Sequence, residues 1–148
     1  MSSSELTPAG DILKRKLRYM LSDVGVADFN EAHGRIVDHI VDLHEVIEAV
    51  EEDLPTEPQW IRIQENHKAL EEYVRIHFRA EEKAMEEKKF FGLSVQLEQH
   101  RKFEMEVARV GQGIAARDFS VTEGLKDFLL DWLFTHINRV DMKYKDFF

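Results

Sequence analysis

The sequence contains no cysteine, and this absence removes several classes of protein at once. Disulfide bridges, iron–sulfur clusters and thiolate zinc sites all need cysteine side chains. Any metal ion that this chain binds must therefore be held by the nitrogen of histidine or the oxygen of aspartate and glutamate.

Long apolar runs and an excess of positive charge are also lacking. No stretch approaches the ~20 apolar residues of a membrane span, and the segment from Met1 to Pro8 has no signal-like apolar run. The 20 Lys and Arg against 29 Asp and Glu give a net charge of -9, which repels phosphate groups. We therefore expect no membrane and no nucleic acid as partner, and a cytoplasmic location, while the oligomeric state stays open.

Helix-breaking residues are scarce, with three prolines and seven glycines in 148 residues. Apolar residues recur every three or four positions in four long segments, which is typical of amphipathic helices. Capping pairs mark three of the helix starts: Asp28 with Glu31, Thr56 with Gln59, and Ser120 with Glu123. The pattern predicts an all-α fold, an antiparallel up-down-up-down four-helix bundle over residues 28–148. Residues 1–27 are expected to form an N-terminal arm, with a short helix or packed segment from Ile12 to Leu21.

Each predicted bundle helix carries one histidine on its apolar stripe, namely His33, His77, His100 and His136. A single such histidine is more often a hydrogen-bonded core residue than a ligand, but an antiparallel bundle can bring all four to one level. Glu81, four residues after His77, shares its helix face, while the rest of the charge run over residues 81–89 is interpreted as solvated. Imidazoles and carboxylates without thiolates suit iron, manganese or zinc.

Three more histidines lie on the same helices, and His39, six residues after His33, is interpreted as a solvent-facing side chain. His44 and His67 should fall at a common level about 15 Å from the first group, and each is followed at i+4 by a glutamate, Glu48 or Glu71. A buried or half-exposed polar pair is the commoner explanation, and a separate metal site is the alternative.

Four segments together resemble the successive motifs of the hemerythrin-like family, in particular the bacterial hemerythrins. They are residues 24–33 (VGVADFNEAH), 77–85 (HFRAEEKAM), 100–103 (HRKF) and 132–141 (WLFTHINRVD). Their order, spacing and helix assignment all agree with the family, and the match covers nearly everything after residue 18.

The resemblance implies a non-haem diiron protein that binds dioxygen for storage, delivery or sensing. Its cofactor would be two iron ions joined by an oxo or hydroxo bridge, with dioxygen as a ligand. The implied roles are an iron with an open position held by His33 and His77, a second iron held by His100 and His136, and bridging carboxylates from Glu81 and Asp141. The implied dioxygen pocket is apolar and consists of Ile36, Phe78, Trp132 and Ile137.

Gln96 stands where the family places a third histidine on the second iron. A neutral amide oxygen is a poorer donor to iron than imidazole, so the second iron is expected to be bound weakly or not at all. Three outcomes are open: Gln96 ligates the metal, water fills the gap, or the site holds one metal. The alternatives to a dioxygen-binding protein are an iron enzyme that activates dioxygen or peroxide, and a signalling module with one or no metal.

Two further positions complicate the resemblance. Asp141 follows His136 by five residues, which on a straight helix places it about 140° around the axis. A π-bulge in this segment would bring the two side chains onto one face. Asn30 stands where the family often has aspartate, so a carboxylate that supports a ligand is expected to be missing.

Overall fold

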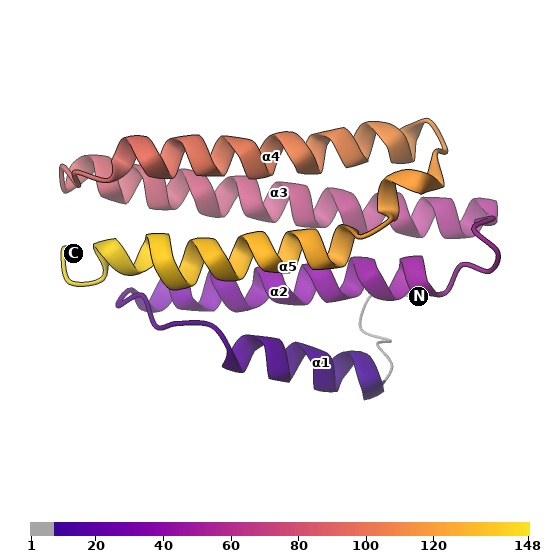
Figure 1. Ribbon diagram of the computed structural model, residues 1–148, viewed down its shortest axis with the longest axis horizontal. Helices are drawn as coiled ribbons and strands as arrows, with labels where there is room; N and C mark the ends of the chain where they lie inside the picture. Colours follow the sequence, from indigo (N-terminus) through magenta and orange to yellow (C-terminus); the bar gives the residue numbers. More distant parts are fainter. Residues whose placement is uncertain (1–7) are drawn as a thin grey trace.

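The computed structural model describes residues 8–148, and every regular element in that range is helical. The bundle helices are α2 (Ala27–Glu48), α3 (Glu57–Glu87), α4 (Leu93–Ala115) and α5 (Leu125–Thr135), and they run alternately up and down (Figure 1). A short turn, η1 (Phe119–Thr122), precedes α5, and two turns continue it, the π-helical η2 (His136–Val140) and the 3-10 helical η3 (Asp141–Tyr144). The predicted all-α bundle is confirmed.

The predicted N-terminal arm contains a helix, α1 (Pro8–Tyr19), which lies along the outside of α2 (Figure 1). Two ion pairs join the helices, Lys14 with Asp42 and Arg18 with Asp38. Gly34 allows the close approach, since a Cβ atom there would lie 3.2 Å from Cζ of Arg18. Residues 1–7 of the predicted arm lie outside the described residues.

One of the three predicted capping pairs is present. Thr56 and Gln59 form a reciprocal capping box at the start of α3. The prediction at Asp28 is wrong, because α2 begins at Ala27 with the Val26 carbonyl accepting the first helical hydrogen bonds. The prediction at Ser120 is also wrong. The Asp118 carboxylate accepts from the Ser120 amide and starts a 3-10 turn, so α5 begins only after Gly124.

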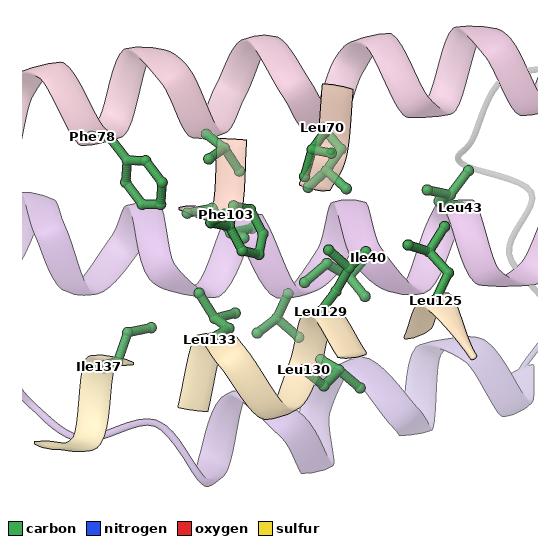
Figure 2. Packing of buried hydrophobic residues seen from close by; sticks show 14 of the residues in the cluster. Ile40, Leu43, Leu70, Phe78, Phe103, Leu125, Leu129, Leu130, Leu133 and Ile137 are labelled. Carbon is green, nitrogen blue, oxygen red and sulfur yellow. The ribbon is translucent and has the colours of Figure 1, made fainter. Parts of the chain in front are cut away.

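Buried hydrocarbon side chains pack together in the middle of the bundle. Figure 2 shows Ile40 and Leu43 of α2, Leu70 of α3 and Leu129 of α5 turned toward one another between the helices. All four are at most 1% exposed. This apolar interior separates the two ends of the bundle, where the histidines lie. Among the described helices, none is long and apolar enough to cross a membrane.

Candidate metal centre

Six buried ionisable side chains lie close together between the helices, and all six were singled out from the sequence. They come from every bundle helix or its continuation: His33 from α2, His77 and Glu81 from α3, His100 from α4, His136 from η2 and Asp141 from η3. None of them is more than 5% exposed. The structure thus brings the predicted ligand set together, while the role of each side chain as a ligand stays a prediction.

The two carboxylates lie between the imidazoles. We call His33 and His77 the first pair, and His100 and His136 the second pair. Oε1 of Glu81 lies 3.0 Å from Nε2 of His77 and 3.6 Å from that of His100, and Oε2 lies 3.6 Å from Nε2 of His33. Asp141 oxygens lie 3.0 Å from Nε2 of His136 and 3.4 Å from that of His33. Each carboxylate therefore approaches both pairs, as a bridging ligand must.

These polar atoms have almost no hydrogen-bond partners. Among the described residues, nine buried side-chain nitrogen or oxygen atoms have none, and eight of them belong to this cluster or to Gln96. The ninth, Oδ1 of Asp42, lies 2.8 Å from the Lys14 ammonium. Buried polar groups in proteins are nearly always paired, so a concentration of unpaired atoms indicates that a ligand completes the site. Imidazole nitrogens facing carboxylate oxygens fit a divalent cation.

The second pair is oriented by hydrogen bonds on the far side of each ring. Nδ1 of His100 lies 2.7 Å from the Glu82 carboxylate, and Nδ1 of His136 lies 2.7 Å from the side-chain carbonyl of Gln99. Since both acceptors require a proton on Nδ1, neutral rings carry their lone pairs on Nε2, which faces the centre. Nδ1 of His33 is buried without a partner.

The π turn resolves the spacing problem of Asp141. Residues His136 to Val140 form one π-helical turn, and Asp141 begins the next turn. The wider turn brings Asp141 to the side of the chain that carries His136, leaving their facing atoms 3.0 Å apart. The local irregularity predicted from the i, i+5 spacing is confirmed.

Gln96 points into the cluster and is 1% exposed. Its amide nitrogen donates a hydrogen bond to Oδ1 of Asp141 at 2.9 Å, and its own oxygen has no partner. The carboxylate oxygen that Gln96 engages is the one nearest His136. Gln96 is therefore placed to hold Asp141, and it reaches a metal through its oxygen only if the amide turns over.

The surroundings of the cluster favour an ionised Glu81 carboxylate and a protonated Tyr144 phenol. Burial by itself opposes ionisation of Glu81, but the imidazoles of His77 and His33 hold the pKa of that carboxyl well below its ordinary value. Burial and the adjacent Glu81 and Asp141 carboxylates raise the pKa of the Tyr144 phenol far above its ordinary value. Tyr144 thus stays protonated and donates to Oε2 of Glu81 at 2.7 Å.

Of the four predicted pocket residues, Phe78 and Trp132 contact the second pair, and Ile36 and Ile137 are part of the buried core. Ile36 and Ile137 are fully buried. The Phe78 ring stacks on His100 with centroids 3.8 Å apart, and the partly buried Trp132 stacks on His136 at 4.5 Å. Phe78 lies 6.1 Å from the His77 ring. The two stacked rings restrict the orientation of His100 and His136, and their role in a dioxygen pocket stays a prediction.

Sequence reasoning missed three residues of this region. Glu82 was interpreted as solvated surface, yet its side chain is only 13% exposed. The signal was its place next to Glu81 and one helical turn from Phe78. Gln99 and Tyr144 gave weaker signals, namely adjacency to His100 and a spacing of three residues from Asp141. Asn30, in contrast, does not support a ligand: it accepts from the Val24 amide and donates to Asp23.

The other histidines form no second cluster of this kind in the described chain. Nε2 of His67 lies 2.7 Å from the Val107 carbonyl, which satisfies it within the protein. His44 is half-buried, with Nδ1 3.8 Å from a Glu48 oxygen. The described residues contain one group of three potential ligands whose donor atoms all lie within 4.8 Å, and it consists of His33, His77 and Glu81.

The fold and the cluster together define a class: a four-helix bundle with a buried histidine and carboxylate centre for cations. The family model described as "Hemerythrin HHE cation binding domain" matches residues 24–148, so the chain belongs to the hemerythrin family. The sequence is also 28% identical over 123 residues to the protein named bacteriohemerythrin from Methylococcus capsulatus (strain ATCC 33009 / NCIMB 11132 / Bath). That alignment covers 83% of this chain and 86% of the relative.

Proposed function

We propose that this chain is a non-haem diiron protein that binds dioxygen, with a weakened second iron position. The observation that carries the proposal is the set of six unpaired atoms, four imidazole Nε2 atoms and one oxygen each of Glu81 and Asp141, that face one buried centre. Iron, bound by histidine and carboxylate, would supply the reversible redox chemistry that dioxygen binding needs. Membership of the hemerythrin family supports a cation as the ligand.

In this proposal the first pair and the two carboxylates hold one iron. His33 and His77 offer Nε2, Glu81 and Asp141 each offer an oxygen, and these atoms come from α2, α3 and η3. That makes four donors, which leaves coordination positions free. The buried Ile36, Phe78 and Ile137 side chains would keep water and anions away from the centre while admitting an apolar gas molecule.

The second pair holds the other iron with two imidazoles, one fewer than the family resemblance implies for that position. His100 and His136 offer Nε2, and the carboxylates are shared with the first iron. Gln96 binds Asp141 instead of offering an imidazole, which lowers the number and strength of donors. The unpaired Gln96 oxygen becomes a ligand if the amide turns over, and otherwise water fills the position.

A second candidate is a centre with one metal. It is favoured by the hydrogen bond from Gln96 to Asp141, which occupies the oxygen nearest the second pair. The compact group formed by His33, His77 and Glu81 is complete without the second pair. A one-metal centre fits the role of a signalling module better than that of a dioxygen carrier.

Metal counting under controlled oxygen separates the two candidates. The protein is loaded anaerobically with ferrous iron, freed of excess metal, and followed by optical spectroscopy as air is admitted and withdrawn. We expect two irons per chain and a reversible oxygen-dependent band, with the second iron held more tightly in Gln96→His. Gln64→His, at an exposed position on α3, is the control for an added histidine.

The outcomes are distinct. One iron in the native chain and two in Gln96→His would support the one-metal candidate. A reduced, iron-loaded protein whose optical spectrum did not change in air would contradict the proposal that the protein binds dioxygen. Turnover of peroxide with a reducing dye, lost in His77→Ala, would support the enzymatic alternative instead.

A further inference from the structure

The hydrogen bonds behind the buried imidazoles are unequal. His100 donates to a carboxylate, that of Glu82, whereas His136 donates to the neutral carbonyl of Gln99. Nδ1 of His33 is buried with no partner. The one anionic acceptor in this set therefore lies behind a histidine of the second pair, the half of the centre that contains Gln96.

Hydrogen bonds from Arg79 hold the Glu82 carboxylate in place. Arg79 Nη1 donates to both oxygens of Glu82 at 2.7 Å, and Nη2 donates to both oxygens of Glu104. The Glu82 side chain is 13% exposed and the His100 side chain is fully buried. Arg79, at the surface, thus fixes the Glu82 carboxylate beside the buried His100. Binding of a metal would therefore cost no conformational entropy at Glu82.

A carboxylate behind a ligating imidazole changes what that imidazole does. It fixes the ring orientation, keeps the proton on Nδ1 and increases the basicity of Nε2. Replacing such a partner typically costs about 10- to 100-fold in metal affinity. The gain in metal affinity through His100 would fall on the second site, where Gln96 stands in place of a histidine.

We propose that Glu82 is a positioning residue that strengthens metal binding by His100 and so compensates in part for Gln96. The inference rests on the proposed two-metal centre. It gives a role to the ion pairs of Arg79 on the surface of α3 and α4, since they connect through Glu82 to the buried His100.

The test is a titration of the metal-free protein with Co²⁺ under anaerobic conditions, read from its visible absorbance and fitted to two sites. We expect Glu82→Gln, which keeps the hydrogen-bond acceptor and removes its charge, to weaken the second site roughly 10- to 100-fold and to leave the first within about threefold. Glu104→Gln is the matched control, since it removes a charge from the same Arg79 network without touching a ligand.

Two more variants sharpen the result. Gln99→Glu places a carboxylate behind His136, and we expect it to tighten the second site. In a Gln96→His background, Glu82→Gln should cost less than in the native chain, which is a non-additive outcome for interacting positions. Circular dichroism of the metal-free variants checks that all of them fold.

Failure of this inference and failure of the proposed function give different results. Two bound metals with Glu82→Gln indistinguishable from Glu104→Gln would overturn the role of Glu82 alone, as would an equal loss at both sites. One bound metal in the native chain would overturn the two-metal centre and the compensation together.

Discussion

The two ends of the bundle both contain histidines, and they differ in what those histidines lack. At the cluster, Nε2 of His33, His77, His100 and His136 is buried without a hydrogen-bond partner. Toward the other end, His67 is equally buried, but its Nε2 lies 2.7 Å from the Val107 carbonyl. Burial is thus shared by the two regions, while an unmet need for a partner is confined to one. That unmet need, more than burial or residue type, distinguishes the end of the bundle that contains the cluster.

The energetic scale of the difference is large. A buried polar atom without a partner costs about 1–3 kcal/mol, and native domains are stable by only about 5–15 kcal/mol in total. Six such atoms, the four Nε2 atoms and one oxygen each of Glu81 and Asp141, face one centre and would consume much of that stability. A cation bound there would remove this cost, whereas His67 already has a partner. The comparison therefore predicts that metal controls the stability of one end only.

Metal removal should give the largest effect. We expect the metal-loaded chain to unfold about 8–16 °C above the metal-free chain, because a ligand at 1,000 times its Kd contributes about 4 kcal/mol and each kcal/mol shifts Tm by about 2–4 °C. Differential scanning calorimetry with and without a chelator measures the difference. An unchanged Tm would show that the unpaired atoms find other partners and that the contrast between the two ends is not energetic.

Alanine substitutions at His67 and His77 should separate the two kinds of histidine. We expect His67→Ala to destabilise the metal-free protein by about 2–4 kcal/mol and to leave the metal count unchanged, because it removes a satisfied hydrogen bond and opens a cavity. We expect His77→Ala to abolish metal binding by the first pair while costing less stability in the metal-free state.

Urea unfolding and metal analysis of both variants supply the two measurements. The comparison would be broken if His67→Ala lost metal, or if His77→Ala were the more destabilising variant without metal. Loss of metal in both variants would mean that the two ends are coupled through the apolar interior that Figure 2 shows.

Much of this contrast could be predicted from the sequence. Apolar periodicity gave the four helices, because each helix buries a stripe of side chains recurring every three or four residues. The same stripes contained His33, His77, His100 and His136, so their convergence followed from the fold. The π turn was predicted from the family resemblance, which implies that His136 and Asp141 face one centre although their i, i+5 spacing separates them on a regular helix.

The remaining features depend on contacts that no periodicity encodes. Glu82 lies in a run of charged residues, and only the position of α4 shows that it meets His100. Tyr144 reaches Glu81 across 63 residues of chain after two irregular turns. The helix start predicted at Ser120 was wrong because the Asp118 carboxylate accepts from the Ser120 amide, which the predicted capping box assigned to Glu123. Contacts between distant segments determine the roles of Glu82 and Tyr144, and competition between neighbouring side chains determines where α5 begins.

Tyr144→Phe should have an intermediate effect confined to the cluster. The phenol donates to Oε2 of the ionised Glu81 in a buried position, so its loss is expected to destabilise the metal-free protein by about 1.5–3 kcal/mol. Bound metal should reduce that loss, since a cation also satisfies the carboxylate. Tyr73→Phe, at a partly buried tyrosine on α3, is the control. Equal losses with and without metal would show that the hydrogen bond to Glu81 contributes independently of the metal, and no loss at all would show that Tyr144 contributes through packing alone.

The smallest expected effect concerns the end without the cluster and tests whether its histidines behave as ordinary buried groups. Partial burial, assisted by Lys126, lowers the pKa of His44 below its ordinary value of 6.5, and Glu48 opposes this only in part. A histidine with a lowered folded-state pKa binds protons more readily in the unfolded chain, so folding stability should decrease as the pH falls below about 6.5. Urea unfolding of the metal-free protein between about pH 7.5 and 5 should therefore show a shallower slope in His44→Gln than in the native chain. The buried carboxylates are common to both proteins and cancel in that difference. A steeper slope in the variant would mean that protonated His44 is stabilised by Glu48, and that this end of the bundle also contains an unmet electrostatic need.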